Sequence, residues 1–136
     1  MTKIGAKRKS PKKPMKRKQI KLFPLDLLFS KYIKTKANFT CEYCGKQGSQ
    51  LHCHHGVVGG RYRNTRYEED NCACVCVSCH WFLGDFPQIN TAFFQKRIGS
   101  DRVEQLQILA RSKTRIDTDT IGEEIKRRLA ELKGVG

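Results

Sequence analysis

Cys41-Glu42-Tyr43-Cys44 and Cys76-Val77-Ser78-Cys79 are the two stretches that decide the fold of this chain. Each stretch holds a Cys-x2-Cys pair, and about 30 residues separate one pair from the other. A tight turn at each pair offers two sulfurs at the spacing that tetrahedral Zn²⁺ requires, so the four cysteines predict one structural zinc site. Cys74 is an alternative ligand, because Cys74-x-Cys76 could supply a sulfur of the second pair.

The segment between the two pairs is rich in histidine. Leu51-His52-Cys53-His54-His55 alternates apolar and polar residues, which is typical of a short strand, and Asn71 to Val75 predicts the returning strand. His80 follows the last cysteine directly and begins a predicted helix. We therefore expect a strand, strand, helix unit around a metal, in which His80 returns toward His54 and His55.

Apolar residues at helical spacing predict helices on both sides of this unit. In segment 25–33 they occupy one helix face, which should pack on the zinc core. A short helix after Pro87 should end at Gly99, and Ser100 or Asp101 should cap the helix that follows.

The last predicted helix begins at the capping box Thr120-x-x-Glu123 and ends at Gly134. Its apolar face, Ile121 to Leu132, and that of the preceding helix, Val103 to Ala110, suit either of two roles. They can pack on the core of the same chain, or they can form the interface of a symmetric dimer.

Several residues of the central region have simpler interpretations. Cys53 and Cys72 are left over from the zinc set and should pack in the core as small apolar residues. His52 points away from Leu51 and Cys53 on an alternating strand and should be exposed. The aromatic residues near the second cysteine pair are expected in the core more often than at a base-stacking surface; they are Trp81, Phe82, Phe93 and Phe94.

Composition limits the class of protein. A chain of 136 residues allows one small domain, for which zinc is the expected staple. The cysteine count of seven is odd, and we find neither an apolar signal segment nor an apolar run of 18 residues. We therefore expect an intracellular protein in a reducing compartment, with neither disulfides nor a membrane span.

The net charge of +14 is concentrated at the N-terminus, where ten Lys or Arg and no acidic residue occur up to Lys21. This basic tail should be disordered when free and should attract DNA phosphates, for example through Lys12, Lys13 and Arg17. A merely solubilising arm is the alternative. The predicted organisation is a tail at 1–22, a zinc domain at 23–99 and a helical pair at 100–136, in the α+β class.

With these motifs the chain resembles the NinG or Rap recombination endonucleases of lambdoid phages, which are HNH-type nucleases acting on branched DNA. The residues that carry the resemblance are His55, Arg66-Tyr67-x2-Asp70-Asn71, Cys76-x2-Cys79, Phe82-Leu83 and Arg97-Ile98-Gly99. The layout is also similar to that of phage recombination endonuclease VII, a four-cysteine zinc protein that resolves Holliday junctions. The resemblance implies a treble-clef-like ββα-metal core and a phage protein working in the bacterial cytoplasm.

The resemblance also implies a role for each polar residue of the central region. His55 would be the general base, and His54 and His80 would bind one catalytic cation, Mg²⁺ or Mn²⁺. Asn71 would hold His55 in place by hydrogen bonds across the loop; its alternative role is that of an ordinary turn residue. Two departures from the pattern matter for the choice of metal: His80 replaces a frequent Asn, and His54 replaces a frequent Asp.

The loop from Gly56 to Asp70 has a composition suited to phosphate contact. Any of Arg61, Arg63 and Arg66 could clamp a phosphate with its guanidinium fork, and the sequence does not indicate which of the three does so.

The leading hypothesis is thus a metal-dependent HNH endonuclease that cuts Holliday junctions or displacement loops. A homodimer, and phage or host recombination proteins as partners, are compatible with this hypothesis but are not required by it. Branch preference rests on the resemblance alone. The alternatives are a zinc-dependent DNA-binding or adaptor module without catalysis, a general HNH nuclease, and a sequence-specific restriction or homing nuclease.

Overall fold

The computed structural model describes residues 16–48 and 50–135, and the side chains of 24–48 and 50–134. The predicted phosphate contacts of Lys12, Lys13 and the Arg17 side chain lie outside the described residues. Within the described part, no helix is both long and apolar enough to cross a membrane.

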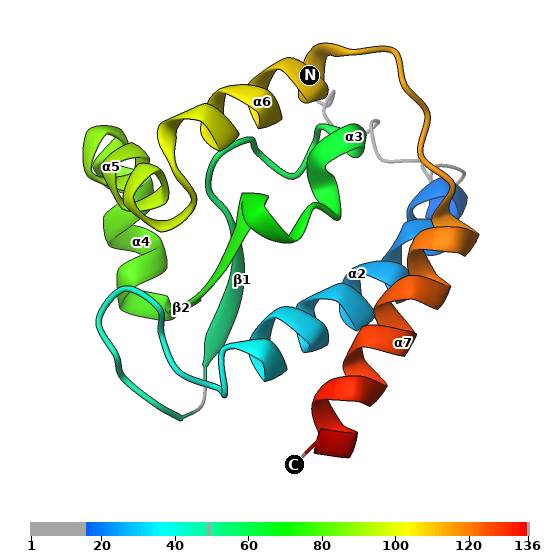
Figure 1. The fold of residues 1–136 in the computed structure, drawn as a ribbon, viewed down its shortest axis with the longest axis horizontal. Coiled ribbons are helices and arrows are strands. Elements are labelled where there is room, and N and C mark those ends of the chain that lie inside the picture. The colour runs from blue at the N-terminus through cyan, green and yellow to red at the C-terminus, as the bar shows by residue number, and fades with distance from the viewer. Residues whose placement is uncertain (1–15, 49, 136) are drawn as a thin grey trace, which may run out of the picture.

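A two-stranded antiparallel sheet forms the centre of the fold (Figure 1). Strand β1 is Leu51–His55, as predicted, and β2 is Cys72–Cys76, one residue later than predicted. The register pairs Leu51 with Cys76 and His55 with Cys72, and all five residues of β2 are buried. Helix α4 (Val77–Asp85) follows β2 directly, so the predicted strand, strand, helix order is present.

Further helices surround this hairpin (Figure 1). They are α2 (Lys16–Lys36), α5 (Pro87–Ile98), α6 (Ser100–Arg111) and α7 (Thr118–Val135). Helices α2 and α7 lie side by side, while α4, α5 and α6 follow one another on the opposite side of the hairpin. The loop between the strands is more ordered than expected, since it contains the short helix α3 (Arg63–Arg66) and the 3-10 turn Glu69–Asn71.

The predicted helix starts require corrections. Helix α2 begins at Lys16, so it includes residues 16–22, which the charge pattern assigned to the tail. Helix α4 begins at Val77 and not at His80, which places Cys79 in its first turn. The N-cap of α6 is Gly99, with φ of +92°, and neither Ser100 nor Asp101, because the sharp turn from α5 uses the conformational freedom of glycine.

Helix α7 also differs from its prediction at both ends. It starts at Thr118 because the Asp117 carboxylate accepts hydrogen bonds from the backbone N–H groups of Asp119 and Thr120. The capping box at Thr120 therefore lies inside the helix. Gly134 does not end it, since the helix continues to Val135.

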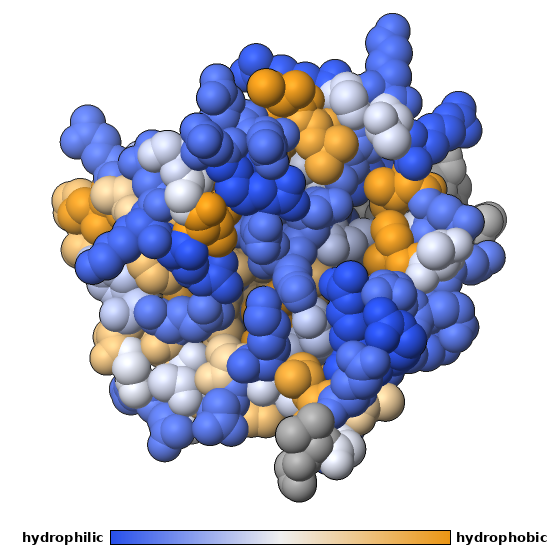
Figure 2. All heavy atoms as spheres, viewed as in Figure 1, coloured by the Kyte–Doolittle hydropathy of each residue, from blue (hydrophilic) through white to orange (hydrophobic). Residues whose placement is uncertain are grey.

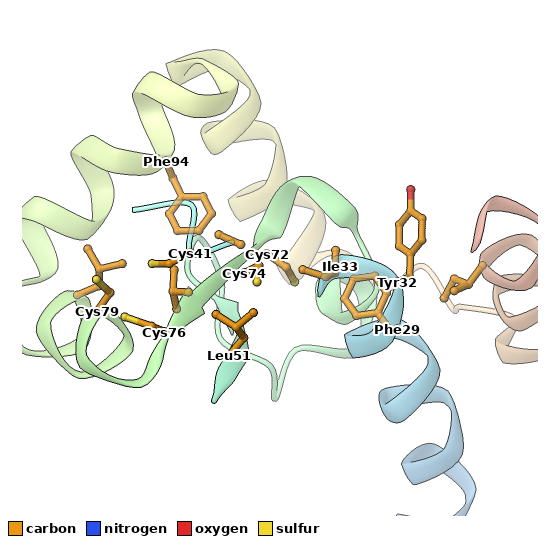
Figure 3. Packing of buried hydrophobic residues seen from close by; sticks show 14 of the residues in the cluster. Phe29, Tyr32, Ile33, Cys41, Leu51, Cys72, Cys74, Cys76, Cys79 and Phe94 are labelled. Carbon is orange, nitrogen blue, oxygen red and sulfur yellow. The ribbon is translucent and has the colours of Figure 1, made fainter. Parts of the chain in front are cut away.

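One hydrophobic core joins the hairpin to helices from both ends of the chain (Figure 3). Phe29 of α2, Cys72 of β2 and Phe94 of α5 belong to the same buried cluster as Val103 of α6 and Ile125 of α7. The C-terminal helices thus pack on the core, and their apolar faces are largely used within the chain. On the face shown in Figure 2 the hydrophobic residues form small separate patches among hydrophilic ones.

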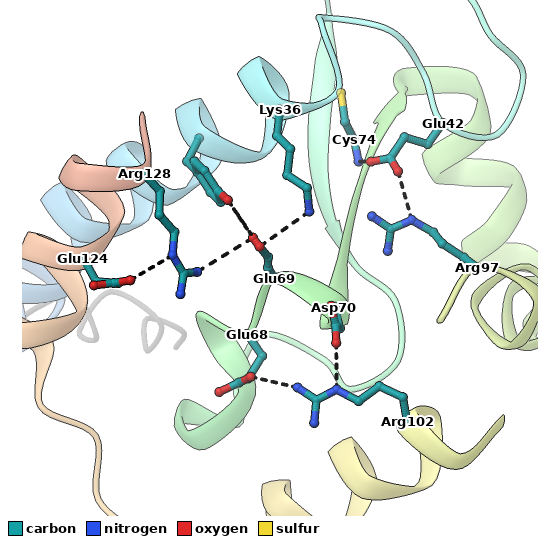
Figure 4. A network of polar contacts seen from close by, with 11 residues as sticks. Lys36, Glu42, Glu68, Glu69, Asp70, Cys74, Arg97, Arg102, Glu124 and Arg128 are labelled. Carbon is teal, nitrogen blue, oxygen red and sulfur yellow. Dashed lines mark hydrogen bonds and ion pairs between the residues drawn. The ribbon is translucent and has the colours of Figure 1, made fainter. Parts of the chain in front are cut away.

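Ion pairs fasten the end of the inter-strand loop to the helices (Figure 4). Glu69 accepts a 2.6 Å hydrogen bond from the Tyr32 hydroxyl and lies 3.5 Å from the Lys36 ammonium. Burial and the Glu69 carboxylate raise the pKa of Tyr32 to about 12. Arg102 of α6 binds both Glu68 and Asp70, at 3.0 and 2.7 Å. The loop that ends beside β2 is therefore held from two sides.

Candidate functional site

The four cysteines of the two Cys-x2-Cys pairs meet in one cluster. Their sulfur atoms all lie within 4.8 Å of one another, and the sulfurs of Cys44 and Cys76 are 3.8 Å apart. Tetrahedral Zn²⁺ with bonds of about 2.3 Å needs sulfurs about 3.8 Å apart, so the donor set fits this ion. Cys41, Cys76 and Cys79 are buried and Cys44 is exposed. The arrangement suits a closed structural site.

Backbone N–H groups favour a thiolate in this cluster. The N–H of Cys44 donates to the Cys41 sulfur at 3.4 Å. Burial raises the pKa of Cys41, but hydrogen bonds from the backbone of Cys44 and Cys76 outweigh it and lower the pKa to about 7. A metal ion can therefore displace the proton at little cost.

Cys74, the alternative ligand, lies apart from this cluster among the described residues. Its side chain is fully buried, and burial is the main reason that its pKa rises to about 11. Its backbone instead pairs with Glu42 of the first cysteine turn: the Cys74 N–H donates to the Glu42 carboxylate at 2.8 Å, and the Glu42 N–H donates to the Cys74 carbonyl. Arg97 binds the same carboxylate at 2.9 Å (Figure 4).

His52 was expected to be exposed, and this prediction is wrong. It is half-buried, and its Nδ1 atom lies 2.7 Å from Nδ1 of His80. The two rings meet edge to face with their centres 4.9 Å apart. The 2.7 Å separation is that of a hydrogen bond between the two rings, and imidazole nitrogens are also of the type that binds divalent transition metals.

His54 lies on the same face of β1, deeper in the protein. It is 8% exposed, and its Nε2 atom is 2.8 Å from the Asn90 side-chain oxygen. Asn90 is oriented by donating its amide N–H to the Gly56 carbonyl, so His54 Nε2 is the donor and Nδ1 carries the lone pair. The His54 and His80 rings are 4.9 Å apart. The predicted approach of these two residues is confirmed, while the role of His54 as a ligand stays a prediction.

Gly56, which follows the two histidines, is required by this packing and not only by loop flexibility. A Cβ atom there would overlap the ring of Phe94 and come within 2.9 Å of His54 Nε2. The close approach of α5 thus fixes the end of β1.

His55 points to the other side of β1, toward Phe29 and Arg66. Its Nε2 atom donates to the Arg66 carbonyl at 3.0 Å, which leaves the lone pair of a neutral ring on Nδ1. Burial lowers the pKa of His55 below the ordinary 6.5, and it does the same for His54 and His80. All three rings are therefore neutral near pH 7.

Asn71 is fully buried and spans the loop that surrounds His55. Its side-chain oxygen accepts the Val58 N–H at 2.6 Å, and its amide donates to the carbonyls of Val58 and Thr65 at 2.8 and 3.2 Å. Thr65 is itself buried and precedes Arg66, the partner of His55. These bonds hold the loop backbone next to the Arg66 carbonyl, which orients the His55 imidazole.

His52, His55 and His80 line one pocket of about 360 Å³ along β1. Lys34 of α2 also lines it and was not singled out from the sequence. Arg66, by contrast, binds Asp26 through two hydrogen bonds of 2.8 Å. Because this pairing occupies the Arg66 fork, Lys34 is the better placed cation for a phosphate in the pocket.

The remaining predicted DNA contacts lie on the surface. Arg61 and Arg63 are both exposed, and Arg61 donates to the Tyr62 hydroxyl at 3.0 Å. Trp81 was expected in the core more often than at a surface, but it is 69% exposed on α4, next to His80. Phe94 is buried as expected.

A second sulfur and nitrogen group lies on the His55 side of the hairpin. One ligand atom each from Cys53, His55 and Cys72 lies within 4.8 Å of the others. Cys72 belongs to the core, as predicted, and Cys53 is partly buried against that core while it also lines the pocket with His55. Sequence spacing did not indicate this group or the pairing of His52 with His80, although strand alternation places His52 with His54 and Cys53 with His55.

The family model described as "Bacteriophage Lambda NinG protein" matches residues 3–136. No curated protein and no solved structure matches the chain.

Proposed function

This chain belongs to the bacteriophage lambda NinG family of phage recombination proteins, and we propose that it acts there as a metal-dependent HNH-type endonuclease on branched DNA. The observation that carries the proposal is one pocket that is lined both by His55, oriented by a backbone carbonyl, and by His52 and His80, whose Nδ1 atoms lie 2.7 Å apart. A phage enzyme of this kind would work in the cytoplasm of the infected cell.

His55 would act as the general base. Its Nε2–H is committed to the Arg66 carbonyl, so its Nδ1 lone pair can take a proton from a water molecule. The water oxygen forms a bond to phosphorus, and the bond from phosphorus to the 3′ oxygen breaks. Asn71, by donating to the Thr65 carbonyl, would hold the backbone next to the Arg66 carbonyl that keeps the ring in this orientation.

His80 and His52 would hold the catalytic cation, Mg²⁺ or Mn²⁺, with His54 as the further candidate ligand from the sequence. Such a cation, when bound, supplies Lewis-acid stabilisation of the charge on the phosphate and on the departing 3′ oxygen. His54 would contribute at least by orienting His80, since the two rings are in contact and Asn90 fixes His54 from behind.

The DNA would be held by cations around this pocket. Lys34 lies inside it, and Arg61 and Arg63 lie exposed on the loop beyond β1. The basic tail, with Lys12, Lys13 and Arg17, would add attraction that is independent of sequence and weakens with salt. The cysteine cluster would hold a structural Zn²⁺ that keeps the hairpin and α4 together.

Cleavage of a synthetic four-way junction and of the matched linear duplex tests the proposal. Wild type should cut the junction with Mg²⁺ or Mn²⁺ and should stop with EDTA. His55→Ala should reduce the rate by about 10²- to 10⁴-fold, because the base is lost, while zinc content, thermal unfolding and DNA affinity stay unchanged.

Each other outcome identifies a different protein. Equal cutting of junction and duplex would make it a general HNH nuclease. Binding of DNA without cleavage under any metal would make it a DNA-binding module. Full activity of His55→Ala would show that another residue is the base.

A further inference from the structure

We propose that Cys53, Cys72 and His55 form a second cation site, selective for soft metals of the Zn²⁺ type, and that metal bound there switches the nuclease off. The binding part stands on the arrangement of the three side chains. The inhibitory part rests on the proposed function of His55.

The three side chains are brought together by the hairpin. Cys53 and His55 are two residues apart on β1 and so share one face of the strand, and Cys72 is the register partner of His55 on β2. Their ligand atoms lie within 4.8 Å of one another. A tetrahedral zinc site needs ligand atoms about 3.3–3.8 Å apart, a separation that this arrangement of side chains can provide.

The donor set selects the class of metal. Two sulfurs and one imidazole are ligands for Zn²⁺ and similarly soft ions and are poor ligands for Mg²⁺, which prefers oxygen. The group shares no residue with the four cysteines of the structural cluster. It also shares no residue with the pair of His52 and His80, which offers nitrogen and no sulfur.

The pocket gives the metal a route of entry. Cys53 and His55 line it, whereas Cys72 is fully buried behind them. An ion entering from the pocket meets Cys53 and His55 first and has Cys72 beneath it. Three protein ligands leave the fourth position open toward the pocket, where water or a phosphate oxygen would bind.

Metal at this site is incompatible with base catalysis by His55. Its Nε2–H is donated to Arg66, and the only lone pair of the neutral ring is on Nδ1. A metal on Nδ1 occupies that lone pair, and a metal on Nε2 displaces the proton that holds the ring to the Arg66 carbonyl. In both cases His55 no longer accepts a proton from water in its working orientation.

Cobalt binding tests the site without any use of activity. Co²⁺ is added to protein that already holds one equivalent of zinc, and the near-ultraviolet charge-transfer band from thiolate to cobalt is recorded. Wild type should bind a second equivalent that produces this band, in addition to any cobalt held by the nitrogens of His52 and His80, which give no thiolate band. Cys53→Ala should bind the second equivalent at least about tenfold more weakly and lose most of the band.

Matched variants keep the result interpretable. Cys74→Ala changes a cysteine of the same hairpin, the register partner of Cys53, that belongs to neither cluster, and it should bind cobalt like wild type. Cys72→Val removes the buried sulfur and should behave like Cys53→Ala; if it does not fold, the pocket-lining Cys53 decides the question. A wild type without the second equivalent, or a Cys53→Ala that keeps the band, overturns the proposal.

The regulatory part is tested by the ratio of cleavage rates with and without added Zn²⁺ at constant Mg²⁺. The ratio should fall at least about tenfold for wild type and Cys74→Ala, and much less for Cys53→Ala. Equal inhibition of Cys53→Ala would place the inhibiting zinc at His52 and His80 and overturn the regulation. If the protein binds the second equivalent of cobalt but never cuts DNA, the metal site is supported and the proposed nuclease function is wrong.

Discussion

The same short hairpin carries two sites of opposite character. Beside its Cys76 end, four sulfurs lie close enough together to hold one ion, and three of the four cysteines are buried. Along β1, imidazoles line a pocket open to solvent, and their donors do not complete a coordination shell. A closed set of four ligands is typical of structural metals, and an incomplete set is typical of catalytic ones. One site stabilises the scaffold, and the other can use it for chemistry.

The sharpest test of this contrast is Cys79→Ser, for which we expect the largest effect. Loss of a zinc ligand should unfold the domain, because structural zinc contributes on the order of 10 kcal/mol of folding free energy in small modules. Circular dichroism and zinc content measure the outcome, with Cys74→Ser as the control among the buried cysteines outside the cluster. If Cys79→Ser stays folded and active with reduced zinc, the cluster does not have the structural role proposed for it.

Substitutions in the open site should affect function and leave the fold intact. His52→Ala should weaken Mn²⁺ binding by about 10- to 100-fold, because its Nδ1 faces His80 from the pocket wall. His54→Ala should weaken it less, since His54 is buried and bound to Asn90. Calorimetric titration with Mn²⁺ measures both, with thermal unfolding as the check on folding.

The order of these two effects decides the ligand set. A larger loss for His54→Ala would restore the pair of His54 and His80 inferred from the sequence. A loss for neither variant would mean that the cation binds elsewhere.

The smallest expected effect is the loss of DNA affinity when the phosphate contact proposed for Lys34 is removed. Lys34→Ala should weaken junction binding by about fivefold and reduce the salt slope by about 1, because one phosphate contact is lost. Lys31→Ala, an exposed position of the same helix outside the pocket, should change neither as much. Fluorescence of Trp81, the single tryptophan and an exposed neighbour of His80, can report binding. Equal losses of junction affinity for both variants would mean that Lys34 contributes only to the general positive charge of the surface.

Local patterns predicted a large part of the hairpin and little of its surroundings. β1 has the predicted bounds because alternation over Leu51 to His55 matches a half-buried strand. The starts of α6 and α7 were misplaced because Gly99 and Asp117 compete as caps with the residues that follow them. The order within the inter-strand loop depends on a hydrogen bond from Tyr32 and on ion pairs with Arg102, and both residues are distant in sequence. Such contacts leave no local signal.

The sequence by itself determined the four-cysteine cluster, because ligands with two residues between them in a tight turn are constrained by the chain alone. It also determined the family and the approach of His80 to His54. Only the tertiary structure decided that His52 meets His80, that Arg66 is taken by Asp26, and that Cys53, Cys72 and His55 converge. The direction of a strand side chain and its partner across the fold depend on what packs against each face, and that is set by helices far away in the chain.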